Sequence, residues 1–302
     1  MKSASRRWPL PAKWLLPVLE LLLLAAPLAV LNAQAPAKIF VASFGGDPND
    51  GSRGAPKRTF QAAHDAVAAG GQIVVLDTAG YGTLNITKSI SLTVPPGVNG
   101  FVTAIGSASG ITINAGTTDS VTLRGLIVEG GGIAAGGIGL SITTVGNLAI
   151  EDCTVRNFER GIDVFSSTPV KCYLRHCVAR GCRIGFDLET NTSTTAHSGI
   201  AIGCRFEQNQ DFGVIAAVFG GNGSVDLTLT DCVVAGTAGS AGAVGVSSQG
   251  SNAVVVRVEN CRIAGNAFGV DAPAGGQLFS RGNNTLENNA NGNTFPGSYS
   301  AK

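Results

Sequence analysis

The chain has 302 residues, of which 42 are glycine and only 14% are charged, and its formal net charge at pH 7 is +1. A charge so close to zero argues against nucleic acid or an anionic membrane surface as a partner. Abundant glycine with few charges is typical of a protein built from many short strands and tight turns.

Residues 1–35 have the layout of a secretory signal peptide. A basic start at Lys2 and Arg6 is followed by an apolar run over 15–31 and by small residues up to Ala35. Without this segment the balance is 17 Lys and Arg against 19 Asp and Glu, a net charge of −2. We therefore expect a secreted or cell-envelope protein with no membrane contact after cleavage. The alternative is an adhesin held at the cell surface by an uncleaved anchor, although Glu20 inside the run disfavours a membrane span.

Residues 36–71 differ from the rest of the chain and predict an N-terminal cap segment. The stretch 44–58 is rich in turn residues, and Phe60, Ala63 and Val67 after it share one face of a helix. A short amphipathic helix in front of the first coil would cover an otherwise open apolar end.

Residues 72–285 contain a repeated sequence motif. In each repeat an alternating apolar run is followed by a cysteine, a second run and a glycine. The cysteines are separated by 24, 27, 28 and 29 residues. A self-similar period of this length predicts a stacked solenoid, here of about ten coils, ending in a polar tail over 286–302. The repeated cysteines are Cys153, Cys177, Cys204, Cys232 and Cys261.

The repeated cysteines are predicted to be unpaired. Equivalent residues of neighbouring coils lie about 4.7–4.9 Å apart, whereas a disulfide needs Cβ atoms about 3.8 Å apart. We interpret them as an internal stack of buried thiols. Cys172 also falls at an inward strand position, whereas Cys182 falls in a turn and is predicted to be the more reactive thiol. The spacing is not that of a zinc site, so no zinc is expected.

Charged residues also recur at fixed places relative to the cysteine column. Both sets point outward if the apolar residues point inward, so opposite charges on neighbouring coils should form ladders. Each pair contributes a few tenths of a kcal/mol, up to about 1. The columns are Glu129, Arg156, Arg180 and Glu207, three residues after the cysteine position, and Arg124, Glu151 and Arg175, two before it.

The sequence resembles the right-handed parallel β-helix family, the pectate-lyase-like superfold. The motifs that carry the resemblance are NDGS at 49–52, TFQAAHDAVAAGGQIVVL at 59–76 and the repeated coils over 121–272. The resemblance implies an all-β, right-handed parallel β-helix solenoid with an N-terminal capping helix. Its members include polysaccharide lyases, polygalacturonases, adhesins and proteins without known activity, so it indicates a fold rather than a function.

In catalytic members the cleft runs along one outward strand face, which by this resemblance is the strand after each repeat glycine. There Asp163 and Asp187 would be neighbours, with Glu189 two residues further along. Paired carboxylates serve glycoside hydrolysis or, in a lyase, bind calcium, here through Asp163 and Asp187. Arg160 or Arg183 would assist proton abstraction. The full column would be Ser141, Asp163, Asp187, Ile215, Ser247 and Asp271.

Two functions are compatible with these residues. The first is a secreted scaffold or binding module for a polysaccharide or cell-surface glycan, without a catalytic site or cofactor, because outward strand positions are ordinarily polar. The alternative is a polysaccharide lyase or glycoside hydrolase acting on a uronate-containing polysaccharide, with Asp163, Asp187, Glu189, Arg160 and Arg183 as its catalytic residues. Apart from Glu129, which belongs to a charge column, the Gly- and Ala-rich turns at 129–139 and 235–245 supply no acid, base or aromatic side chain, which favours binding. The sequence does not predict an oligomeric state.

Overall fold

A computed structural model describes residues 35–190, 194–219, 223–239, 242–248, 254–274 and 276–300. The predicted signal peptide lies, apart from its last residue, outside the described residues. Within the described ranges, no helix is long and apolar enough to cross a membrane.

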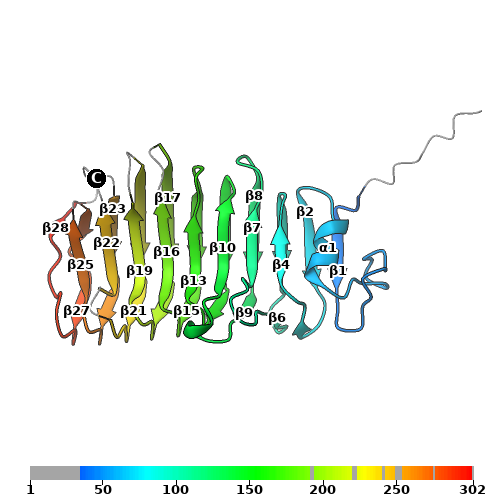
Figure 1. Cartoon of the computed structure of the whole chain (residues 1–302), viewed down its shortest axis with the longest axis horizontal. Coiled ribbons are helices and arrows are strands. Elements are labelled where there is room, and N and C mark those ends of the chain that lie inside the picture. The colour runs from blue at the N-terminus through cyan, green and yellow to red at the C-terminus, as the bar shows by residue number, and fades with distance from the viewer. Residues whose placement is uncertain are drawn as a thin grey trace, which may run out of the picture. The chain divides into compact units, whose positions relative to one another are not determined.

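The described residues form a solenoid of three parallel β-sheets, A, B and C (Figure 1). Successive strands join sheets A, B and C in turn, so each strand pairs with its equivalent one coil away. The predicted all-β parallel β-helix is thus confirmed. The smallest sheet, C, has 8 described strands, so the described residues hold at most eight complete coils, and the prediction of about ten was too high.

The strands are short and their bounds are as follows. Sheet A contains β1 (Lys38–Val41), β2 (Gly71–Val75), β5 (Ile90–Thr93), β8 (Ser120–Arg124), β11 (Asn147–Glu151), β14 (Lys171–Arg175), β17 (Ala196–Ile202), β20 (Ser224–Thr230), β23 (Val254–Glu259), β26 (Gln277–Ser280) and β28 (Gly297–Ser298). Sheet B contains β3 (Ala79–Gly80), β6 (Gly100–Thr103), β9 (Leu126–Glu129), β12 (Thr154–Arg156), β15 (Val178–Arg180), β18 (Arg205–Glu207), β21 (Val233–Ala235), β24 (Arg262–Ala264) and β27 (Thr285–Glu287). Sheet C contains β4 (Leu84–Ile86), β7 (Ile111–Asn114), β10 (Ile138–Thr144), β13 (Arg160–Phe165), β16 (Ile184–Thr190), β19 (Phe212–Val218), β22 (Val244–Ser248) and β25 (Val270–Ala274).

The alternating runs build the core because every second side chain points into the coil. In β11, for example, Leu148 and Ile150 are buried and stack on Cys172 and Leu174 of the next coil. The turns from sheet A to sheet B are tight and left-handed, with positive φ at residues that include Asp152. Short polar side chains and glycine tolerate this conformation, which explains why they recur just before the cysteine.

The cysteine stack is confirmed, and all seven cysteines are free and buried. Four of the thiols, those of Cys153, Cys177, Cys232 and Cys261, donate to backbone carbonyls of the preceding coil. Cys177 Sγ, for example, donates to the carbonyl of Ile150 over 3.2 Å and Cys232 Sγ to that of Ala201 over 3.3 Å. The prediction of a reactive Cys182 was wrong. This residue is fully buried, and burial raises the pKa of its thiol to about 11, so the nucleophilic thiolate is disfavoured.

The charge ladders are confirmed in part. Arg124 and Arg175 both pair with Glu151, and Arg156 pairs with Glu129 on the neighbouring coil. The predicted partnership of Arg180 with Glu207 does not form an ion pair. Glu207 instead accepts from Arg205 of its own strand over 2.6 Å, because both side chains lie on the outer face of β18, two residues apart.

The N-terminal segment contains the predicted helix, α1 (Phe60–Ala66), which starts where the Thr59 side chain accepts from the amide of Ala62. Phe60 and Ala63 are buried, and α1 packs against β1, β2 and β4 (Figure 1). Because β4 is the outermost described strand of sheet C, α1 lies at the end of that sheet. Its action as a protective cap stays a prediction. The segment also supplies β1, and the predicted tail supplies β28 to the same sheet.

Candidate functional site on the outer face of sheet C

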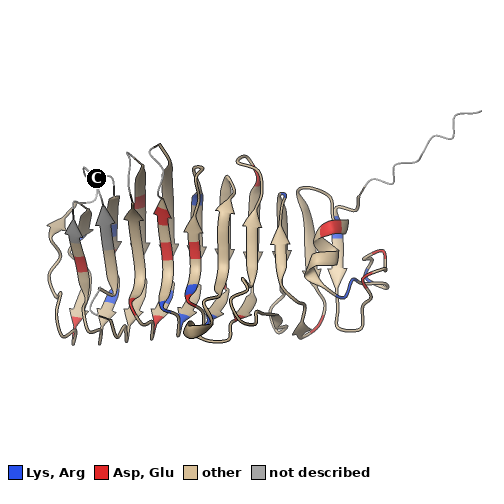
Figure 2. Ribbon diagram, viewed as in Figure 1, with Lys and Arg blue, Asp and Glu red and all other residues tan. Residues whose placement is uncertain are grey.

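Three neighbouring strands of sheet C, β13, β16 and β19, present a mixed acidic and apolar surface. Figure 2 shows acidic residues on adjacent strands of this sheet. The inner residues of the same strands, such as Ile162, Phe186 and Val214, belong to the main core. The outer side chains fall in three rows across the coils: Arg160, Ile184 and Phe212; Asp163, Asp187 and Ile215; Phe165, Glu189 and Ala217.

The predicted neighbours Asp163 and Asp187 are register partners, as expected. The predicted column fails further along, because Ile215 pairs with Gly245 rather than with Ser247. Ser247 instead pairs with Ala217. Because Val214 pairs with Val244, Ala243 holds the place that Gly213 has one coil earlier, and the count from Gly245 therefore started two residues too late.

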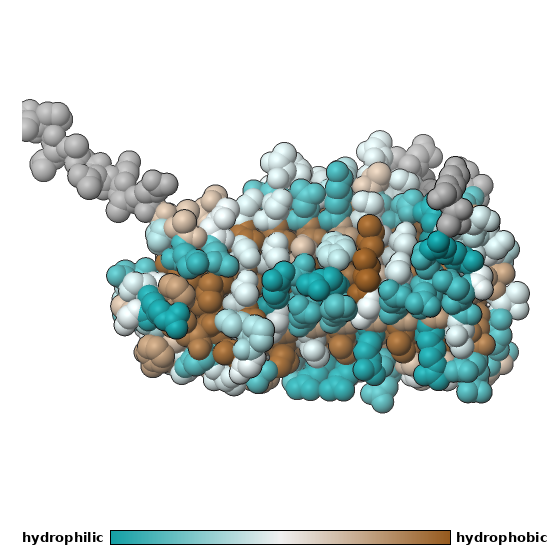
Figure 3. Space-filling model, turned by 180° about the vertical axis from the view of Figure 1, so that it is seen from behind, coloured by the Kyte–Doolittle hydropathy of each residue, from teal (hydrophilic) through white to brown (hydrophobic). Residues whose placement is uncertain are grey.

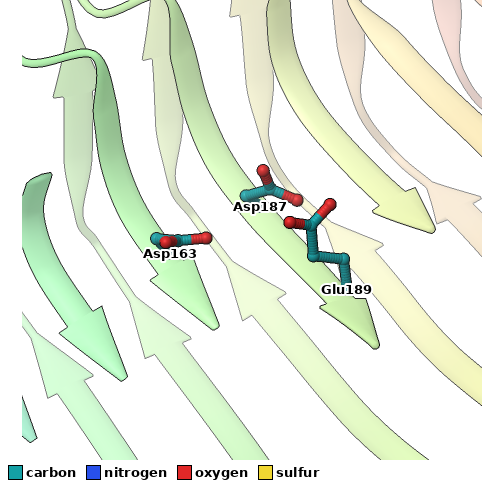
Figure 4. A group of neighbouring side chains, drawn as sticks. All are labelled: Asp163, Asp187 and Glu189. Atoms are coloured by element: carbon teal, nitrogen blue, oxygen red, sulfur yellow. The ribbon is translucent and has the colours of Figure 1, made fainter. Parts of the chain in front are cut away.

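Asp163, Asp187 and Glu189 form a compact carboxylate cluster, in which one oxygen of each lies within 4.8 Å of the others (Figure 4). The residues are only 6%, 1% and 6% exposed. They leave the coil on its outer side, as predicted, but neighbouring side chains cover them. An ordinary polar position on an outward strand face would be open to water, and these are not.

The guanidinium of Arg160 lies among the three carboxylates. Its Nη1 donates to Asp163 Oδ1 over 3.3 Å, to Glu189 Oε1 over 2.7 Å and to Asp187 Oδ2. Burial alone would lower the pKa of Arg160, but the surrounding carboxylates raise it, so this side chain stays charged. One cation therefore serves three acids.

Burial and the excess of acid raise the pKa values of the two aspartates. Burial raises the pKa of Asp163 to about 6, with Arg160 opposing the shift. Burial and then the charge of Glu189 raise the pKa of Asp187 well above its ordinary value. Asp187 Oδ1 is also buried without a hydrogen-bond partner among the described residues. A buried, perturbed carboxyl of this kind marks a candidate functional residue.

Arg183, the fifth predicted residue, does not join the cluster. Its Nε donates to Glu159 Oε1 over 2.6 Å and its Nη1 to Asp211 Oδ2 over 3.0 Å. Four of the five predicted residues thus come together, and Arg183 flanks them with its own two acids.

A pocket of about 450 Å³ opens over this surface. Its aromatic wall, which the sequence analysis missed, includes Phe165 and Phe219, 42% and 38% exposed. Phe165 is the last residue of β13, and Phe219 directly follows β19. Their position at the ends of these strands was the only feature of the sequence that could have pointed to the pocket wall. The lining residues are Arg160, Phe165, Arg183, Ile184, Asp187, Glu189, Phe212, Ile215 and Phe219.

The cluster does not fit a calcium ion while Arg160 is in place. Calcium takes 6–8 oxygen ligands, and the carboxylate oxygens that face one another here already bind Nη1. A calcium ion in this cluster would also be repelled by the Arg160 guanidinium. Two unit charges of the same sign 4 Å apart repel by about 4 kcal/mol at an effective dielectric constant of about 20, and calcium carries two. Asp163 and Asp187 thus form an acidic cluster, as expected for the predicted calcium site. The positive charge within this cluster is the guanidinium of Arg160.

A second hollow, of about 380 Å³, lies over the outer face of sheet A between β8 and β17. Tyr173 and the exposed Ile200 contribute apolar surface there, and Lys171 and Asn147 contribute polar groups. The side of the molecule turned away from Figure 1 is mostly hydrophilic, with scattered hydrophobic side chains (Figure 3). No group of three acidic or metal-ligating side chains lies there in the part of the chain that the structure describes.

Comparison with known proteins agrees with this architecture. The family described as "Right handed beta helix region" matches residues 109–291, more than half of the chain. The chain belongs to this family. No curated protein matches it significantly.

Among solved structures, the pectate lyase Pel9A is similar, with 18% identity and a TM-score of 0.53 over 88% of this chain and 78% of that protein. A rhamnogalacturonan lyase is 12% identical, with a TM-score of 0.48 over 80% and 72% of the two chains. The pectin methylesterase PemA from Erwinia chrysanthemi is 10% identical, with a TM-score of 0.45 over 82% and 89%. At these identities the likeness shows the fold alone, and of these three structures Pel9A has a TM-score above 0.5.

Proposed function

We propose that this protein binds a polysaccharide in the pocket over β13, β16 and β19. The observation that carries the proposal is the pairing of exposed Phe165 and Phe219 with the buried carboxyl groups of Asp187 and Glu189 in one hollow. Sugar rings present apolar faces that pack on aromatic rings and hydroxyl groups that donate to carboxylates. Extended solenoid faces also suit long polymeric ligands.

Export is part of the same proposal. The basic start, apolar run and small residues of the first 35 residues support a secreted or cell-envelope location, where polysaccharides are met. Mass spectrometry of the protein from its native host tests this point. A mature chain that begins near Gln34 or Pro36 is expected, and an intact N-terminus would favour the anchored adhesin.

Binding is tested by titration calorimetry against a panel of polysaccharides and their oligomers. Phe165→Ala and Phe219→Ala should each weaken binding at least tenfold, because each removes aromatic surface from the pocket wall. Phe44→Ala is the matched control, since Phe44 is also an exposed phenylalanine but lies outside this pocket. Equal losses in all three variants, or no binding to any polysaccharide, would contradict the proposal.

A second candidate function is glycoside hydrolysis at the same pocket, and the raised pKa of Asp187 favours it. A carboxyl whose pKa is raised holds its proton more tightly and can act as a general acid, and Glu189 is the neighbouring carboxyl group that could act as nucleophile. Their oxygens lie within 4.8 Å, closest to the spacing of about 5–5.5 Å in retaining enzymes. Elimination is less favoured, because Arg160 and Arg183, its candidate bases, are held in ion pairs.

Hydrolysis is tested by following new reducing ends and unsaturated products with the same panel. Saturated products that vanish in Asp187→Asn, while ligand still binds, would establish the hydrolase. Unsaturated products would establish a lyase instead. If neither product forms from any bound glycan, the protein is a binding module.

A further inference from the structure

The pocket over β13, β16 and β19 is surrounded by more acid than base. Its two arginines contact five acidic side chains, so the charges around the pocket sum to an excess of acid. Arg160 contacts Asp163, Asp187 and Glu189 through Nη1, and Arg183 contacts Glu159 and Asp211. A carboxylate brought by a ligand would therefore compete with these acids for each guanidinium.

A ligand carboxylate would also lie near Asp187 and Glu189, which line the pocket although they are largely buried, and their charge would repel it. A uronate could reach such a surface only through a bridging cation. Arg160 Nη1 already bonds the carboxylate oxygens that a bridging ion would use. By contrast, a hydroxyl group carries no charge that these acids would repel, and an ammonium group would be attracted by the excess of acid around the pocket.

We propose that this pocket takes glycans without carboxylate groups, prefers amino sugars to neutral ones, and rejects uronates, with Arg160 as its built-in cation. This inference rests on the proposed polysaccharide binding and adds the class of ligand. The apolar wall of Phe165, Ile184 and Phe219 supplies packing that is independent of ligand charge. The charge of the carboxylates supplies the discrimination.

The decisive experiment compares three oligosaccharides of equal length by calorimetry at low salt with a chelator present. They are a neutral β-linked hexose oligomer, a de-N-acetylated amino-sugar oligomer and an oligogalacturonate. We expect the amino-sugar oligomer to bind at least threefold more tightly than the neutral one, and the oligogalacturonate at least tenfold more weakly. Tighter binding of the oligogalacturonate, or its rescue by added calcium, would overturn the inference while leaving polysaccharide binding intact. No binding of any of the three would count against the proposed function itself.

Two variants sharpen the test. Glu189→Gln removes one pocket charge at constant shape and should narrow the gap between neutral and uronate oligomers at least threefold. Glu287→Gln, an exposed acid paired with Arg262 outside the pocket, should leave that gap unchanged. The same shift in both variants would mean that long-range charge, not the pocket, sets the preference.

The role of Arg160 is tested with calcium alone. The wild-type protein should show no calcium binding that depends on Asp163, Asp187 and Glu189, whereas Arg160→Gln should gain such a site because the triad loses its internal cation. Calcium binding to the wild type that disappears in Asp187→Asn would overturn the proposal. That measurement needs no Arg160 variant, so it decides the question even where Arg160→Gln fails to fold.

Discussion

The outer faces of this solenoid carry two groups of charged residues that the sequence presents in the same way. On sheet A, Arg124 and Arg175 share Glu151 in an open ladder. On sheet C, the acids Asp163, Asp187 and Glu189 share Arg160 under cover. Both groups arise because equivalent outward positions stack one coil apart.

The two groups differ in stoichiometry and in burial. The ladder has two cations for two acids, since Arg175 Nη2 also lies 3.8 Å from Asp152 Oδ2, and water reaches its arginines, so its charges are balanced at little cost. The cluster has three acids for one cation and is almost closed to water. Excess charge without solvent is costly and raises carboxyl pKa values, which is what distinguishes a candidate site from a structural ladder.

The largest difference should appear when the shared cation is removed. Arg160→Ala leaves three buried carboxylates uncompensated, and we expect a loss of about 3–5 kcal/mol in the free energy of unfolding at pH 7. Urea denaturation at pH 7 and pH 4.5 measures it. The loss should shrink at pH 4.5, where the aspartates bind protons. A loss below 1 kcal/mol at pH 7 would mean that the cluster is hydrated and resembles the ladder.

The pH dependence of stability should come next in size. Because the folded-state pKa of Asp163, about 6, is above its ordinary value of 3.8, the folded state binds a proton more tightly than the unfolded chain. The stability contributed by this group is complete below pH 4 and declines as pH rises through 6, by about 2–3 kcal/mol. Asp163→Asn removes this titration. The variant should therefore gain stability relative to wild type between pH 4 and pH 7. A stability difference that does not change over this range would refute the raised pKa.

The smallest effect is expected in the ladder. Arg124→Ala should cost only about 0.2–1 kcal/mol, because the pair is exposed and Arg175 still compensates Glu151. The loss should fall further in 0.5 M salt, where exposed charges are screened. A loss as large as that of Arg160→Ala would erase the distinction between the two groups.

The sequence predicted the solenoid because the cysteine period reports the coil length directly. It also predicted that Asp163 and Asp187 are neighbours, since both follow a repeat glycine at the same distance. It failed at Ser247, because in that coil Ala243 holds the place of the repeat glycine, and at Cys182, where a turn position proved to be buried. It did not reveal that the carboxylates are covered or that Arg160 lies among them. Burial depends on side chains from several coils, and Phe165 and Phe219 join the carboxylates in one pocket only once the coils are stacked.

The buried thiols have a consequence for how this protein would be inactivated irreversibly. The seven free cysteines are buried in the folded state, so we expect the coil to shield them from oxidants. Unfolding would expose them to oxidants, and disulfides could then form within or between chains. In an oxidising medium, each unfolding of the chain could therefore be followed by irreversible oxidation of its thiols. We expect the half-life of the folded protein there to depend on its unfolding rate rather than on its equilibrium stability.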